Sequence, residues 1–87
     1  MSGYIIILST VIHTPMDLQH IHQAIVTFHG VSEWSVDLED CDQILRVACT
    51  ENIGLELVKS LERMRVSSSV LEVFDENGIS LQNFVST

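Results

Sequence analysis

The chain has 87 residues, of which 46% are hydrophobic, and twelve acidic against four basic residues give a formal net charge of −8. This length makes one domain, near the lower end of what a single hydrophobic core stabilises without a disulfide or a metal. The acidic balance argues against a nucleic-acid partner, because neutralising phosphates requires clustered Lys and Arg side chains. No apolar run reaches the ~18 residues of a membrane-spanning helix, so we expect no membrane association.

The two cysteines give no sign of redox chemistry. Asp40 and Asp42 flank Cys41, and negative neighbours disfavour a reactive thiolate. Cys49 lies in an alternating apolar run and fits a small buried side chain. Neither demands an oxidising compartment. Tyr4–Leu8 is apolar, but it is short and no basic region precedes it, so it predicts a strand rather than a signal peptide. We therefore expect a cytoplasmic protein.

The first predicted elements are a central strand and an amphipathic helix. Tyr4–Ile12 is almost continuously apolar, which is typical of a strand covered on both sides. Thr14 can cap the helix that follows, Pro15 suits its first position, and Asp17 lies three residues beyond the cap. Gly30 is the expected helix end. The predicted buried stripe of this helix is Leu18, Ile21, Ile25 and Phe28.

A hairpin is predicted next. Polar and apolar residues alternate strictly along Glu33–Leu38, which places Trp34, Val36 and Leu38 on one face. This pattern is typical of a half-buried strand. Glu39–Asp42 is a charged turn, and Gln43–Cys49 alternates again. The two alternating runs predict paired antiparallel strands.

The remaining pattern completes a fold. Ile53–Met64 has helical spacing with Asn52 or Thr50 as its cap, and Ser68–Phe74 is another apolar strand. Strand, helix, strand, strand, helix, strand is the split βαβ arrangement of the ferredoxin-like fold, an α+β class. Right-handed crossovers place both helices on one face of an antiparallel sheet of order 4-1-3-2.

The C-terminal residues suggest one further element. Asn77-Gly78 is a strong two-residue hairpin signal. It predicts a fifth strand, about Ile79–Phe84, that pairs with Ser68–Phe74. The alternative is a frayed terminus. We therefore divide the chain into a ferredoxin-like domain, residues 1–75, and a C-terminal hairpin extension or tail, residues 76–87.

One segment resembles a known family. Gly30-Val31 leads into Trp34-Ser35-Val36-Asp37-Leu38 and a hairpin, which is similar to the heavy-metal-associated (HMA) domain of small copper chaperones and metal-transporting ATPases. The resemblance covers about Tyr4–Phe74. It implies a CxxC motif in the first loop, where two thiolates hold one soft cation. Counting back from Gly30 places Thr14 and Asp17 at those positions. A hydroxyl and a carboxylate do not replace thiolates for such ions, so the chain resembles a degenerate member without the metal-binding cysteines.

The histidines of the chain do not form an alternative set of metal ligands. His20 and His22 project about 200° apart on a helix. His22 and His29 lie about two turns, roughly 10 Å, apart. Only His13 with Asp17 is geometrically possible, but a cation there would meet a positive helix end with two ligands. We therefore expect no metal and no other cofactor.

No pattern indicates an enzyme. No Ser or Cys has a base at a suitable local spacing, and no glycine-rich phosphate loop is present. The acylphosphatases share this topology but need an arginine in the first loop, which this chain lacks. RNA-binding domains of this topology need exposed aromatic and basic residues on the sheet, whereas Trp34 occupies a core-like position.

These observations favour a non-catalytic interaction domain that forms homodimers or binds a protein partner. With both helices on one sheet face, the first strand would still present apolar residues on the open face, as would Ser68–Phe74. Such patches mark interfaces. Two alternatives remain: a metal-binding or chaperone protein that uses His13 and Asp17, and a regulatory domain that senses a small molecule between paired sheets.

Overall fold

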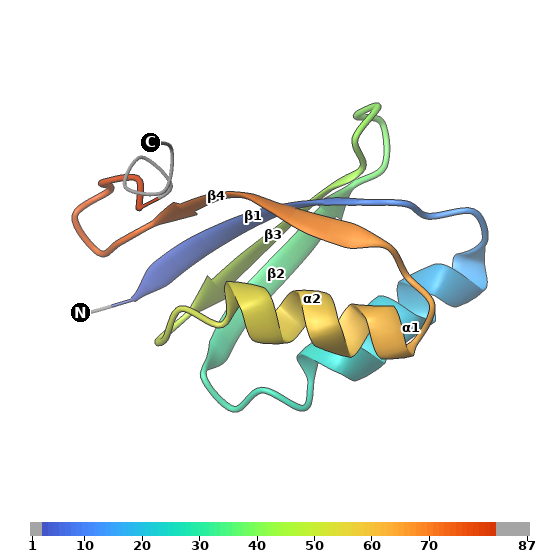
Figure 1. Ribbon diagram of the computed structural model, residues 1–87, viewed down its shortest axis with the longest axis horizontal. Helices are drawn as coiled ribbons and strands as arrows, with labels where there is room; N and C mark the ends of the chain where they lie inside the picture. The colour runs from blue at the N-terminus through green and yellow to red at the C-terminus, as the bar shows by residue number, and fades with distance from the viewer. Residues whose placement is uncertain (1–2, 82–87) are drawn as a thin grey trace.

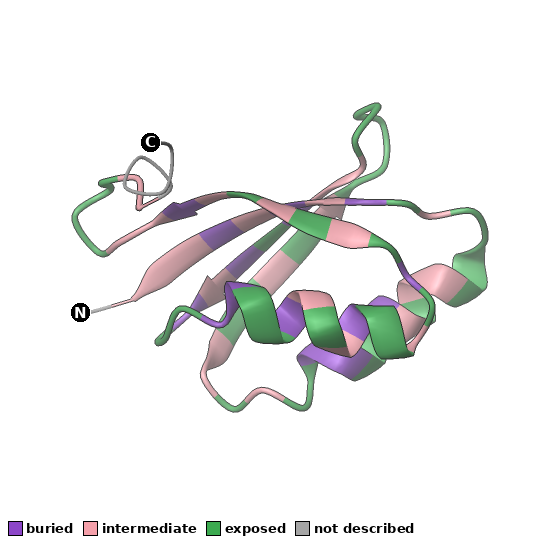
Figure 2. Ribbon diagram, in the orientation of Figure 1, coloured by how far each residue is buried: buried purple, intermediate pink, exposed green. Residues whose placement is uncertain are grey.

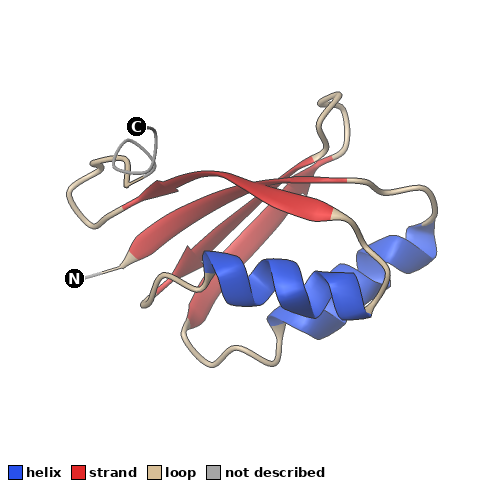
Figure 3. Ribbon diagram, viewed as in Figure 1, coloured by secondary structure: helices blue, strands red, loops and turns tan. Residues whose placement is uncertain are grey.

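Four antiparallel strands and two helices follow one another in the order βαββαβ, which confirms the predicted α+β class. The computed structural model describes residues 3–81 (Figure 1, Figure 3). The elements are β1 (Tyr4–Thr10), α1 (Pro15–Ile25), β2 (Val31–Asp37), β3 (Ile44–Cys49), α2 (Gly54–Arg63) and β4 (Ser68–Phe74). Neither helix, with 11 and 10 residues, is long enough to cross a bilayer.

The sheet has the order β2-β3-β1-β4, and every neighbouring pair is antiparallel. The first strand is therefore paired on both sides, as its continuous apolar sequence requires. Both helices lie on the same side of the sheet in Figure 1. Among residues 3–81, the opposite side of the sheet carries no helix, and we call it the open face.

The core lies between the helices and alternate residues of the central strands. Ile6 and Leu8 of β1 and Leu45 and Val47 of β3 are fully buried on the helix side. Figure 2 shows β1 alternating between buried and half-buried residues along its length. The fully buried helix residues of the same core cluster are Ile21, Ala24, Ile25, Leu57 and Leu61.

Helix α1 ends at Ile25, so the expected end at Gly30 is wrong. The Thr27 hydroxyl donates to the Ala24 carbonyl oxygen at 2.7 Å, which satisfies a backbone group of the last turn. Phe28 lies beyond the helix but still packs against the core. Gly30 has a different role, because a Cβ there would lie 2.4 Å from Thr50 Oγ1.

The other boundaries shift by a few residues. The second helix begins at Gly54 and its N-cap residue is Ile53, so the expected cap at Asn52 or Thr50 is wrong. Asn52 lies one residue earlier, and its Oδ1 accepts the Gly54 N–H at 3.3 Å. Strand β2 ends at Asp37, and Leu38, expected on the buried face, is 50% exposed because it lies past the strand.

The chain turns back after β4. The Asp75 carboxylate accepts the N–H groups of Asn77 and Ile79, both at 2.9 Å. Gly78 has a φ of +79°, which glycine adopts without strain. Phe74 and Ser80 then form an isolated antiparallel bridge. The hairpin begins as predicted, but the described residues 79–81 form this single bridge, and residues 82–84 of the predicted fifth strand lie outside the described part.

Ile6 and Ile7 test the two faces of β1. Ile6 is fully buried, whereas Ile7 is half-buried on the open face. Ile6→Ala should lower the free energy of unfolding by about 2–5 kcal/mol because it leaves a cavity. Ile7→Ala should cost far less, since its side chain already meets water. Urea unfolding at low micromolar protein measures both, and equal losses would mean that the open face is covered.

Candidate functional site

The loop between β1 and α1 is organised by Asp17. Its Oδ2 accepts the backbone N–H of His13 at 2.8 Å and that of Thr14 at 3.2 Å. The Asp17 N–H in turn donates to the Thr14 carbonyl oxygen at 3.0 Å. Thr14 is the extended N-cap residue, and Pro15 opens the helix. The loop therefore has the geometry of a helix start, in which a carboxylate in the first turn satisfies N–H groups that lack helical partners.

The Asp17 carboxylate is held in its charged form. The hydrogen bond from the His13 N–H is the main cause that lowers its pKa from the ordinary value of 3.8. Partial desolvation acts in the opposite direction, and the Thr14 N–H and nearby His13 and His20 side chains add to the lowering. Hydrogen bonds to a carboxylate stabilise its ionised form.

His13 and Asp17, the sequence-derived metal candidates, are adjacent in the structure but lack further ligands. Asp17 Oδ2 already accepts two N–H groups, so a cation would compete with them. Among residues 3–81, no group of three or more potential ligands includes either residue. His29, expected at the end of α1, lies in the loop beyond it because the helix stops at Ile25.

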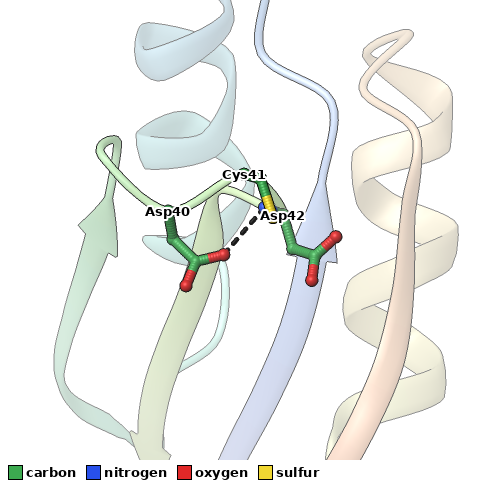
Figure 4. A group of neighbouring side chains, drawn as sticks. All are labelled: Asp40, Cys41 and Asp42. Atoms are coloured by element: carbon green, nitrogen blue, oxygen red, sulfur yellow. Dashed lines mark hydrogen bonds between the residues drawn. The ribbon is translucent and has the colours of Figure 1, made fainter.

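Three potential ligand side chains do gather in the β2–β3 turn. The ligand atoms of Asp40, Cys41 and Asp42 lie within 4.8 Å of one another, and all three residues are exposed (Figure 4). Asp40 Oδ1 accepts the Asp42 N–H at 2.8 Å, the usual arrangement by which an aspartate stabilises a turn. The cluster is therefore explained by turn formation, and the free thiol of Cys41 is exposed among carboxylates.

Gln43 ties this turn to the β1–α1 loop, and sequence reasoning missed it. Its Nε2 donates to the Ile12 carbonyl oxygen at 3.1 Å, and its Oε1 accepts the Ile12 N–H at 2.8 Å. Thr10 Oγ1 also donates to the Gln43 carbonyl oxygen. Gln43 has a φ of +46°, which is unfavourable for a residue with a Cβ. These bonds offset that cost and fix the loop that carries His13.

The open face of the sheet is the other candidate site. Strand register places Phe74, Ile5 and Ala48 side by side across β4, β1 and β3, followed by Glu33 on β2. Phe74, Ile5 and Ala48 are only half-buried. An apolar row therefore crosses three strands on the side of the sheet that has no helix.

The fold defines a class: a ferredoxin-like domain, here with a first loop that carries no cysteine. The structure is similar to that of the N-terminal domain of PacS from Synechocystis PCC6803, with a TM-score of 0.65 and 20% sequence identity. The match covers 77% of this chain and 96% of that one. At this identity the match is a likeness of fold, and it is consistent with the HMA-like resemblance seen in the sequence. No protein-family model matches the sequence, and no curated protein does.

Asp17→Ala should lower the melting temperature at pH 7, because the helix start loses its acceptor. The folded pKa of Asp17 is lowered, so its stabilisation is complete above the unfolded pKa and is lost as the pH falls through the folded one. The difference in melting temperature between the wild-type chain and the Asp17→Ala variant should therefore become smaller as the pH falls. Thermal melts from pH 7 downward measure it. Glu51→Ala, which removes an exposed acid, is the control. A difference in melting temperature between wild type and Asp17→Ala that stays constant with pH would rule out this role.

Proposed function

We propose that this chain is a non-catalytic interaction domain that forms homodimers through the open face of its sheet. The supporting observation is the apolar row of Phe74, Ile5 and Ala48, extended by Ile7 in the next row of β1. These side chains are half-buried without any helix over them. Burying such a surface against a second copy removes apolar area from water, which drives association.

Charge on the same face favours a second copy as the occupant. Arg46 of β3 lies between Ile7 and Ser35 across the sheet and is exposed. It is the basic residue of a face whose strands also carry acids at Glu33 and Glu72. In a two-fold face-to-face pair, each Arg46 meets an acidic strand of the other copy. Such complementarity fixes the register of an interface more than it adds affinity.

The proposal includes an inactive metal loop. Thr14 and Asp17 take the places of the two thiolates and are engaged in starting α1. The net charge of −8 disfavours nucleic acid as a partner. Both cysteines are free thiols, which suits a reducing compartment, so we place the protein in the cytoplasm.

Sedimentation equilibrium tests the dimer. The wild-type chain should be dimeric at high micromolar concentration and dissociate on dilution. Ile7→Lys should weaken the dimer by roughly tenfold or more, since it places a charge at a half-buried apolar position next to the row of Phe74, Ile5 and Ala48. Arg46→Glu should weaken it as well, because acid would then face acid across the interface.

Leu55→Lys is the matched control. Leu55 is 64% exposed on α2, on the helix side of the molecule, so the same type of change there should leave association unaltered. A wild-type chain that stays strictly monomeric at high micromolar concentration would contradict the proposed function. So would a Leu55→Lys variant as weak as Ile7→Lys.

Metal titration tests the loop. Calorimetry with Zn(II) and with Cu(I) should show no saturable binding that depends on His13, and His13→Ala should give the same trace. The double variant Thr14→Cys with Asp17→Cys should acquire binding, since two thiolates suit these ions. Tight binding by the wild-type chain that His13→Ala abolishes would favour the metal-binding alternative.

A further inference from the structure

The outer edge of strand β2 has no neighbour within residues 3–81. β2 pairs with β3 alone, and it lies at the end of the sheet. The other edge strand, β4, is different because Ser80 bridges Phe74 at its end. A register shift between Val31 and Glu33 disturbs the start of β2. The stretch from residue 33 to 37 is therefore a regular strand edge whose outward backbone groups are open to another strand.

A groove runs beside this edge. It has a volume of ≈ 420 Å³ and a mixed lining: Ile25, Val26, Phe28 and His29 from the end of α1 and the loop after it, and Val31, Ser32, Glu33 and Trp34 from β2. The apolar part of the lining includes Val26, Phe28, Val31 and Trp34. Val26 is 59% exposed. The Trp34 ring lies 6.0 Å from that of His22. An added strand next to β2 would direct every second side chain toward this groove.

The opposite side of the same edge is acidic. Glu33, Ser35 and Asp37 alternate with Trp34 and Val36, so the two acids project to the open face. Both acids are exposed. A second copy that paired with β2 in antiparallel register over all of residues 33–37 would set each Glu33 opposite an Asp37. Like charges directly opposite each other destabilise a strand pair.

We propose that the β2 edge binds an extended, basic segment of a partner protein by strand addition. The segment carries Lys or Arg at alternate positions, opposite Glu33 and Asp37, and apolar residues between them that enter the groove beside Trp34. Main-chain hydrogen bonds supply affinity in this mode, and the alternating side chains supply selectivity. The free backbone edge of β2 and the groove lie outside the proposed dimer surface, whereas Glu33 belongs to both sites.

Three capped seven-residue peptides serve as probes: lysine alternating with valine, glutamate alternating with valine, and lysine alternating with alanine. The lysine–valine peptide should shift the fluorescence of Trp34, the one tryptophan of the chain, and the backbone amide resonances of residues 33–37. It should bind about tenfold or more tightly than the glutamate peptide. The lysine–alanine peptide should bind more weakly than lysine–valine, because it leaves the groove unfilled.

A charge reversal separates a specific site from general attraction to an acidic protein. Glu33→Lys with Asp37→Lys should reverse the preference, so that the glutamate–valine peptide binds more tightly. Glu56→Lys with Glu62→Lys makes the same charge change on exposed positions of α2 and should leave the preference unaltered. Melting curves confirm that each variant is folded.

Three results would overturn the proposal. The first is equal binding of the lysine–valine and glutamate–valine peptides. The second is equal loss of lysine–valine binding in both charge-reversal variants. The third is movement of the amide resonances of residues 33–37 with protein concentration alone in the Ile7→Lys variant, which would make a second copy the occupant of the β2 edge. Ile7→Lys, which disrupts the dimer surface, should leave peptide binding intact, so failure of one proposal is distinguishable from failure of the other.

Discussion

Burial of β1 on both edges and on one face is the constraint that arranges the rest of the molecule. Its N–H and C=O groups are paired with β3 on one side and β4 on the other, so polar backbone is satisfied at the centre of a small domain. Ile6 and Leu8 then form the floor on which both helices pack. Because their neighbours along the strand must point the other way, an apolar first strand also supplies Ile5 and Ile7 to the open face. The core and the proposed dimer surface are therefore two faces of one strand.

In the first loop, Asp17 stabilises the start of α1 at a position where a metal-binding relative would carry a thiolate ligand. A helix that begins directly after a strand leaves N–H groups without acceptors, and Asp17 Oδ2 takes two of them. Two thiolates at the same places would leave that need to the backbone and water, and would be free to hold an ion. In this chain the hydrogen bonds of the loop stabilise the fold, and both proposed binding surfaces lie on the sheet, at its open face and at the edge of β2.

Much of the fold could be predicted because it depends on short-range patterns. Alternation in Glu33–Leu38, helical spacing in Ile53–Met64 and the Thr14-Pro15 helix start each carry local information. The errors concern features decided by distant contacts. Gly30 looked like a helix end, but its small size is needed beside Thr50 of another segment. Gln43 looked like the start of a strand, yet it binds Ile12 across 31 positions.

For the candidate site, sequence reasoning found the right loop and the right residues for its structural role. His13 and Asp17 do lie together, and their contact is a backbone hydrogen bond rather than a ligand set. The groove beside Trp34 could not be foreseen, since it depends on where α1 stops. Ile25, Val26, Phe28 and His29, which line one side of the groove, lie at this end and in the loop after it.

The pairing of β1 with β4 has a consequence for how the chain folds. Ile5 lies opposite Phe74. The second edge of β1 therefore pairs only when β4, which lies near the end of the described residues, is available. Closing a loop of that length costs conformational entropy before the strand contacts form. Folding is therefore slower than in proteins whose contacts are mostly between residues close in sequence. Until Ser68–Phe74 leaves the ribosome, a nascent chain presents an apolar strand with an open edge. The acidic character of the whole chain then acts as a safeguard, since mutual repulsion keeps such incomplete chains apart.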